Sequence, residues 1–241
     1  FICLIPFCKF KIPEKKYWLP LFFFSICMGF MANLFMTLSL KEAAIVSPII
    51  IGSQLAIPFA ILLSSLFLKE KVNFKKWIFI FTSFVGVSIL SFDPLIKNEI
   101  YALLLISFMA FFYASAQVFS RYLKELDVTL TNCIMGLCGF FLLFITSYIF
   151  EGDTINNLIN INFKSWLLIL HSAIFVSIAA HMSMFYLYKI YPVNKVFPFY
   201  ALFPIFGILQ TMVIFNEIPT LIVFLGGLIV ITSIYLLNKI D

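Results

Sequence analysis

The stretch Ile100–Ser120, IYALLLISFMAFFYASAQVFS, contains no Asp, Glu, Lys or Arg. About 20 consecutive apolar residues form a helix long enough to cross the hydrocarbon core of a bilayer, so this stretch predicts a membrane-spanning helix. The rest of the chain has the same character, because hydrophobic residues make up 63% of its 241 residues and charged residues only 11%. A soluble domain carries about 25% charged residues. The composition therefore predicts a helical membrane protein with several spans.

Seven further stretches follow the same pattern. The predicted spans are Tyr17–Leu40, Ala43–Leu68, Phe74–Ser91, Ile100–Ser120, Leu130–Phe150, Trp166–Tyr188, Pro192–Phe215 and Thr220–Leu237. The shorter apolar run Phe1–Cys8 is interpreted as the end of one more span. The connections between the spans are too short for a separate soluble domain.

The basic residues indicate the orientation. When successive connections are assigned to alternate sides of the membrane, 13 Lys and Arg fall on one side and three on the other. Lys and Arg next to spans stay on the cytoplasmic side. We therefore predict an integral multi-pass protein of the bacterial inner (plasma) membrane, with its C-terminus in the cytoplasm.

The two halves of the chain align with each other. Trp18 and Trp166 are 148 residues apart, and Glu70 and Glu217 are 147 apart. Five spans separate equivalent points, so the second copy would cross the membrane in the opposite direction. Inverted repeats of this kind are common in secondary transporters. The predicted domains are a first, incomplete repeat, residues 1–92, and a second, inverted repeat, residues 93–241.

The same offset predicts the complete architecture. It places the counterpart of Leu130–Phe150 at the first residues of the chain, and Ile100–Ser120 has no counterpart. We therefore expect an all-α membrane fold of ten helices in two five-helix repeats. The first helix and most of the second would precede Phe1, so that this chain is truncated at its N-terminus.

Several motifs resemble those of a known family. They are FYLYKIYPVNKVFPFYALFP at 185–204 followed by Glu217 and Gly226, LFLKE at 66–70 followed by Trp77 and Gly86, and Tyr113 followed by Ser120 and Arg121. They resemble EamA-type carriers of the drug/metabolite transporter superfamily. Gln54 and the pattern Tyr191-Pro192, Pro198, Pro204 resemble the amino-acid metabolite (cysteine and O-acetylserine) exporters of that superfamily. The resemblance implies export of an amino acid or a derivative.

Polar side chains inside spans are candidates for contacts with a substrate, because placing them in a bilayer is costly. The candidate substrate-binding residues are Asn33, Gln54, Tyr113, Gln117, His181 and Tyr200. Asn33 and His181 are 148 residues apart and so occupy matched positions. The amide of Gln54 can both donate and accept hydrogen bonds. For each residue the alternative is a hydrogen bond between helices.

Prolines within the predicted spans suggest where helices bend. Proline removes a backbone donor and kinks a helix. The candidate hinge residues are Pro48, Pro58, Pro198 and Pro204. The alternative is that prolines are simply better tolerated in membrane helices than in soluble ones. Lys189 follows a predicted span and is expected to extend to water at the membrane surface.

These features predict a secondary transporter that moves a small polar or zwitterionic metabolite by alternating access. We predict no enzyme activity, cofactor or metal site, because His171 and His181 have no acidic partner in the spans and the five cysteines form no C-x-x-C pair. The expected partners are the substrate and the lipid bilayer, without nucleic acid, and a homodimer is left open. The alternatives are a carrier for uptake or exchange of a nucleoside-like or methylated cofactor and, more remotely, a non-transporting structural subunit.

Overall fold

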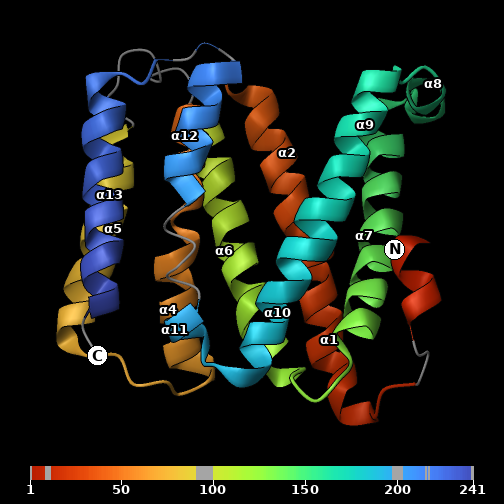
Figure 1. Ribbon diagram of the computed structural model, residues 1–241, viewed down its shortest axis with the longest axis horizontal. Helices are drawn as coiled ribbons and strands as arrows, with labels where there is room; N and C mark the ends of the chain where they lie inside the picture. The colour runs from red at the N-terminus through yellow and green to blue at the C-terminus, as the bar shows by residue number, and fades with distance from the viewer. Residues whose placement is uncertain are drawn as a thin grey trace. The chain divides into compact units, whose positions relative to one another are not determined.

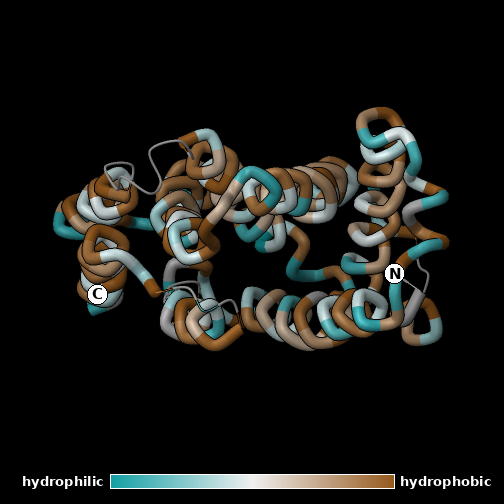
Figure 2. The backbone as a smooth tube through the Cα atoms, turned by 90° about the horizontal axis from the view of Figure 1, so that it is seen from above, coloured by the Kyte–Doolittle hydropathy of each residue, from teal (hydrophilic) through white to brown (hydrophobic). Residues whose placement is uncertain are grey.

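The structure is a computed structural model that describes residues 2–8, 12–90, 100–196, 203–214, 216 and 218–239. Within these residues every regular element is a helix, and no strand occurs (Figure 1). The predicted all-α membrane fold is confirmed. Figure 2 shows that the helices are largely hydrophobic along their length, with hydrophilic residues in short stretches.

Five helical runs of described residues are long and apolar enough to cross a membrane. They are Lys15–Glu42, Ser47–Phe67, Ile100–Tyr122, Val128–Glu151 and Phe163–Ile190. A shorter apolar helix spans Leu221–Leu237. Each run overlaps a predicted span, and most ends differ by only a few residues.

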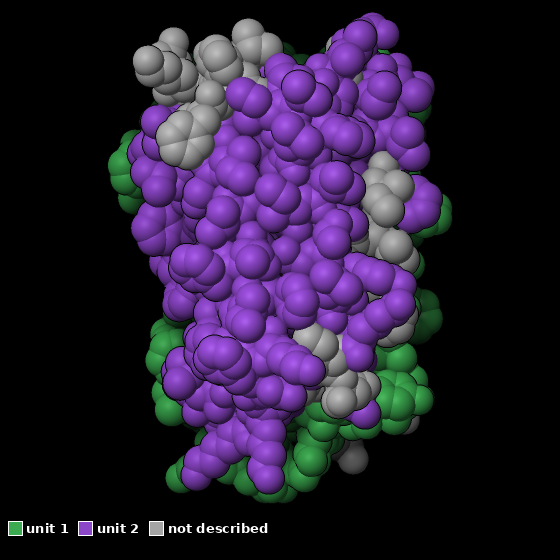
Figure 3. Space-filling model, turned by 90° about the vertical axis from the view of Figure 1, so that its left-hand side faces the viewer, with its two compact units in different colours: residues 1–30, 119–192 green, residues 31–118, 193–241 purple. Residues whose placement is uncertain are grey.

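The chain forms two compact units, which Figure 3 distinguishes by colour. Unit 1 consists of Phe1–Phe30 and Phe119–Pro192, and unit 2 consists of Met31–Val118 and Val193–Asp241. Each unit therefore combines segments from both halves of the sequence. The compact units are not the repeats 1–92 and 93–241, which remain a prediction about equivalent positions in the sequence.

Unit 1 contains two long helical runs beside α7. Its elements are η1 (Ile2–Phe7), η2 (Lys15–Tyr17), α1 (Trp18–Phe24), most of η3 (Ser25–Met31), the end of α6 (Ile100–Tyr122), α7 (Val128–Glu151), α8 (Thr154–Ile159), α9 (Phe163–His171), η4 (Ser172–Ala180) and α10 (His181–Ile190). Both η3 and η4 are π-helical. Helices α1 and α10 each pack against α7. Phe24 is fully buried and meets the ring of Phe185 edge-on, with 5.1 Å between the centroids.

The ends of α7 have local causes. Asp127 precedes the helix, and its carboxylate accepts a hydrogen bond from the backbone N–H of Leu130 at 3.0 Å. This is an N-cap, which satisfies one of the backbone donors left free at a helix start. The helix ends before Gly152, whose φ of 78° is readily available only to glycine.

In unit 1, η3 and α7 touch through their backbones. A Cβ atom added to Gly139 of α7 would lie 2.4 Å from the backbone oxygen of Gly29 in η3. A Cβ atom added to Gly29 would lie 2.5 Å from the backbone oxygen of Met135. Only glycines allow this approach, which resembles the contacts of small residues at other membrane helix crossings.

Unit 2 contains the remaining helices. They are α2 (Ala32–Glu42), α3 (Ser47–Ser53), α4 (Ala56–Phe67), α5 (Phe74–Leu90), most of α6, α11 (Val193–Val196), α12 (Phe203–Ile214) and α13 (Leu221–Lys239). Helices α5 and α13 lie side by side (Figure 1). The hydroxyl of Thr82 donates a hydrogen bond to the hydroxyl of Ser233 at 2.9 Å. Leu90, two turns further along α5, instead lies against Gly226 near the start of α13. The two helices are therefore antiparallel.

The predicted span Ala43–Leu68 consists of two helices rather than one. Pro58 lacks the N–H group that would bond the carbonyl of Gln54 in a continuous helix. That carbonyl accepts from Ile57 at 3.0 Å instead, and the chain turns at Gln54 and Leu55 between α3 and α4. The role of Pro58 as a hinge stays a prediction.

Pro48 lies at the start of a helix rather than within one, and its role as a hinge stays a prediction. Pro48 lies in the first turn of α3, where the missing N–H is not needed and the fixed φ suits a helix. Pro204 is the second residue of α12, and residues 197–202 just before it lie outside the described residues. Pro198 lies outside the described residues, so hinges at Pro198 and Pro204 stay predictions.

Candidate functional site

Gln54 is the most distinctive polar residue of unit 2. Its side chain is 0% exposed. Neither its amide nitrogen nor its amide oxygen has a hydrogen-bond partner among the residues that the structure describes. An amide buried without partners is costly, and most buried polar groups are paired. Among the described residues, the Gln54 amide thus leaves both a donor and an acceptor without a bond.

The contacts of α3 and α4 with α6 determine the level at which Gln54 lies. A Cβ atom added to Gly52 would be 2.7 Å from Ile106 of α6. The ring of Phe59 in α4 meets that of Phe111 in α6, with 5.6 Å between the centroids. Gln54 falls between these two contacts in sequence and therefore lies alongside the middle of α6.

Tyr113 and Gln117 continue along α6 in the same unit. Tyr113 is 6% exposed and Gln117 is 0% exposed. At a rise of about 1.5 Å per residue, Tyr113 lies about 10 Å beyond Ile106 along the helix axis. Three of the six predicted substrate-binding residues are thus buried in unit 2, one on the α3–α4 break and two along α6.

The other predicted residues are placed differently. Asn33 belongs to unit 2 but is exposed on α2. His181 begins α10 in unit 1, is half-buried, and its ring lies 6.3 Å from that of Phe185. Asn33 and His181 belong to different units, so their pairing stays a prediction. Tyr200 lies outside the described residues.

Sequence reasoning missed a buried hydroxyl pair in unit 2. Ser47 at the start of α3 and Thr211 of α12 are 3.1 Å apart. Both are buried, with exposed fractions of 0% and 3%. Serine and threonine are common in membrane helices and usually bond their own backbone, so no local signal distinguished this pair.

Unit 1 contains another buried amide, Asn132 of α7. It is 3% exposed, and its Nδ2 donates to the carbonyl of Val128 at 2.8 Å. Its Oδ1 has no partner among the described residues. Asn132 lines a cavity of about 20 Å³ together with Phe24, Phe185 and Lys189. That volume suffices for one water molecule.

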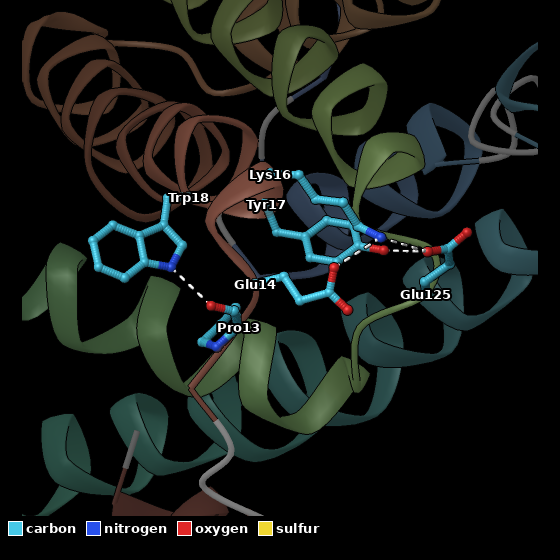
Figure 4. A network of polar contacts seen from close by, with 6 residues as sticks. All are labelled: Pro13, Glu14, Lys16, Tyr17, Trp18 and Glu125. Carbon is cyan, nitrogen blue, oxygen red and sulfur yellow. Dashed lines mark hydrogen bonds and ion pairs between the residues drawn. The ribbon is translucent and has the colours of Figure 1, made fainter.

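A polar network connects the start of α1 with the α6–α7 loop of unit 1 (Figure 4). The hydroxyl of Tyr17 donates a hydrogen bond to the carboxylate of Glu125. The ammonium of Lys16 lies 3.0 Å from the carboxylate of Glu14 and 3.8 Å from that of Glu125. The bond from Tyr17, reinforced by the charge of Lys16, lowers the pKa of the Glu125 carboxyl. Among the described residues, no three His, Cys, Asp or Glu side chains are placed to hold a metal ion.

The comparison with known proteins identifies one family. The model of the EamA-like transporter family matches residues 1–92 and 100–239. No match is found among the curated proteins. The family has an all-helical membrane fold, and its members are membrane transporters of the drug/metabolite superfamily rather than enzymes. Because the two matched segments cover nearly the whole chain, this protein belongs to the EamA-like transporter family.

Proposed function

We propose that this protein is a secondary transporter that moves a small polar or zwitterionic metabolite across the membrane by alternating access. The observation that carries this proposal is the amide of Gln54, buried in unit 2 without a hydrogen-bond partner among the described residues. A substrate that forms these bonds would recover the free energy that burying the amide costs. Tyr113 and Gln117 extend the proposed binding surface along α6.

The chemistry of these side chains favours a substrate without a strong net charge. Gln54 and Gln117 carry amides, Tyr113 carries a hydroxyl, and all three are buried. Phosphate groups are usually held by Arg or Lys in charge-assisted pairs, and none of these three residues provides a cation. We therefore propose an amino acid or an amino-acid derivative. Export as the direction rests on the resemblance to amino-acid metabolite exporters. Asn33, His181 and Tyr200 remain proposed contacts.

Secondary transporters are commonly built from two inverted repeats, and local geometry supports the proposed repeats in this chain. Lys69 and Asn216 are 147 residues apart, and each has a φ of 54°. The backbone N–H of Glu70 reaches the carbonyl of Ser64 at 3.3 Å, which closes the end of α4. A residue in the left-handed conformation just after the last turn is a common way for a helix to end. The π-helical segments η3 and η4 also fall at equivalent positions, because shifting Ser25–Met31 by 148 places it inside Ser172–Ala180.

The pairing of α5 with α13 supports the repeats in a second way. The offset of 147 residues relates Thr82 to Ile229. It also relates Gly86 to Ser233. Thr82 bonds Ser233, and a Cβ atom added to Gly86 would lie 3.0 Å from Ile229. Shifting by 147 residues therefore converts the contact between Thr82 and Ser233 into the contact between Ile229 and Gly86. Such an exchange is expected at an interface with a local twofold axis.

The membrane orientation follows from the basic residues alone. The excess of Lys and Arg on one side favours a cytoplasmic C-terminus, and we propose the inner membrane of a bacterium as the location. This orientation would place the ends of α6 and α10 at the cytoplasmic surface.

The deciding experiment measures transport and stability on the same variants. The purified protein is reconstituted into liposomes, and the flux of radiolabelled L-cysteine, L-serine and uridine is measured separately. We expect flux of an amino acid in the wild type and at least about a tenfold loss in Gln54→Leu, since the substrate loses its bonds to the amide. Flux of uridine alone would instead favour a nucleoside carrier, and no flux of any probe would contradict transport of these substrates.

Thermal unfolding separates a substrate contact from a hydrogen bond between helices. Gln54 has no hydrogen-bond partner among the described residues. Replacing such a buried amide by leucine removes a desolvation cost, so Gln54→Leu should be as stable as the wild type or more stable. A clear loss of stability would mean that the amide holds helices together. Ser53→Ala is the matched control, because Ser53 is a buried neighbour whose hydroxyl already bonds the carbonyl of Ile50 at 2.7 Å.

A further inference from the structure

Two hydrogen bonds inside unit 1 link the end of α10 to the end of α6 and to the α6–α7 loop. The guanidinium of Arg121, in the last turn of α6, donates to the carbonyl of Tyr188 in the last turn of α10. The ammonium of Lys189, also in the last turn of α10, donates to the carbonyl of Leu126 in the α6–α7 loop. We call these two contacts the clasp. Lys189, expected to extend to water, is therefore half-buried and bonded within the protein.

Helix ends favour such contacts. The last four carbonyls of a helix have no partner within the helix, and they carry the negative end of its dipole. A cation from a neighbouring segment both donates a hydrogen bond to such a carbonyl and interacts favourably with the negative end of the dipole. Tyr188 is 1% exposed, so little water can reach its side chain, and the bond from Arg121 satisfies its carbonyl.

The loop buries Leu123, but open space borders much of the rest of it. Open clefts of about 580 and 540 Å³ border it, the first lined by Asp127 and Lys189 and the second by Tyr17, Glu125 and Asp127. The cavity of about 20 Å³ lies against it as well. The bond from Tyr17 to Glu125 adds a third attachment, at the start of α1 (Figure 4). Removing a polar contact should therefore loosen the loop directly.

The clasp lies next to two of the three points at which the chain passes between units. The chain leaves unit 2 for unit 1 between Val118 and Phe119, within α6, and returns to unit 2 between Pro192 and Val193. Arg121 follows the first point by two residues, and Lys189 precedes the second by three. The third passage, between Phe30 and Met31, lies at the end of η3.

We propose that Arg121 and Lys189 are positioning residues that fix these two passage segments to each other inside unit 1. This role in the transport cycle rests on the proposed function, whereas the clasp itself does not. By these two bonds the clasp holds the end of α10 to the end of α6 and to the α6–α7 loop within unit 1. Neither side chain needs to touch the substrate.

Hydrogen–deuterium exchange on the full-length protein tests the clasp without any substrate. We expect Lys189→Gln and Arg121→Gln to speed exchange about tenfold in the loop Leu123–Asp127 and at the ends of α6 and α10, because each loses a charge-assisted bond. Lys189→Arg and Arg121→Lys keep a cation and should largely restore protection. Lys124→Gln is the matched control, since Lys124 is exposed in the same loop and forms no part of the clasp. Exchange in Lys189→Gln equal to that in the control would overturn the clasp.

Transport kinetics test the positioning role. In proteoliposomes with radiolabelled L-cysteine, the two Gln variants should lower Vmax about two- to thirtyfold with KM unchanged, as expected for residues that act away from the bound ligand. A raised KM with normal Vmax, or wild-type kinetics despite faster exchange, would overturn the role. If the wild type transports none of the probes, the proposed function fails. Hydrogen–deuterium exchange at the ends of α6 and α10 then decides by itself whether Arg121 and Lys189 fix these segments to each other.

Discussion

The crossing of η3 and α7 in unit 1 should tolerate no side chain larger than hydrogen, and Gly139→Ala tests this. The added Cβ would lie 2.4 Å from the oxygen, 2.9 Å from the carbonyl carbon and 3.1 Å from the Cα of Gly29. All three atoms are backbone, so no rotamer change can relieve the contact. The helices must separate by about 1 Å to regain ordinary contact of 3.4 Å or more.

Overpacking of this kind typically costs about 1–3 kcal/mol. For a chain of this size each kcal/mol lowers the unfolding midpoint by about 2–4 °C. We therefore expect Gly139→Ala to unfold several degrees below the wild type in detergent, measured with a thiol-reactive dye or by intrinsic fluorescence. Gly227→Ala is the control, because its nearest neighbour at 3.0 Å is the terminal Cδ1 of Ile51, which can rotate away.

A double variant sharpens the test. A Cβ atom on Gly29 would also strike the backbone of α7, 2.5 Å from the oxygen of Met135. Once one alanine has forced the helices apart, the second should cost less, so the stability losses in Gly29→Ala and Gly139→Ala should not add. Wild-type stability in Gly139→Ala, or a loss no larger than that in Gly227→Ala, would refute the close crossing.

Two further predictions concern the end of α4 and the α6–α7 loop. Lys69 adopts a φ of 54°, a conformation that costs a non-glycine residue about 1 kcal/mol, so Lys69→Gly should raise the thermal unfolding midpoint and Lys69→Val should lower it. A Lys69→Gly variant less stable than the wild type would contradict the left-handed helix end. The pKa of Glu125 is lowered by the hydrogen bond from Tyr17 and by Lys16, so its contribution to stability is present above its unfolded-state pKa and is lost as the pH falls through the lower folded-state value. Glu125→Gln should therefore be less stable than the wild type at pH 7 and equal to it in acid, and a difference that persists in acid would exclude this linkage.

The helical spans were largely predictable because their signal is local. The predicted span Phe74–Ser91 differs by one residue from α5, and Leu130–Phe150 lies within α7. Apolar length and flanking charges decide such spans residue by residue. The start of α7 was missed by two residues because Asp127 acts as an N-cap, a signal that span prediction by hydropathy does not include.

The candidate site was predictable only in part. Gln54, Tyr113 and Gln117 are polar residues in apolar spans, and all three are buried in unit 2. Asn33 is polar in the same way but is exposed. Hydropathy treats these positions alike, because burial depends on which neighbouring helix covers a given face. For the same reason the sequence did not indicate that Lys189 bonds a carbonyl 63 residues away.

The amino-acid sequence alone determined that this chain is an all-helical membrane protein, because the free energy of placing each segment in lipid depends mainly on its own residues. Tertiary structure decided the close approach of Gly29 to Gly139. It also decided the clasp and the assembly of each compact unit from both halves of the chain. These features depend on contacts between residues far apart in sequence, whose free energies exist only once the helices have packed.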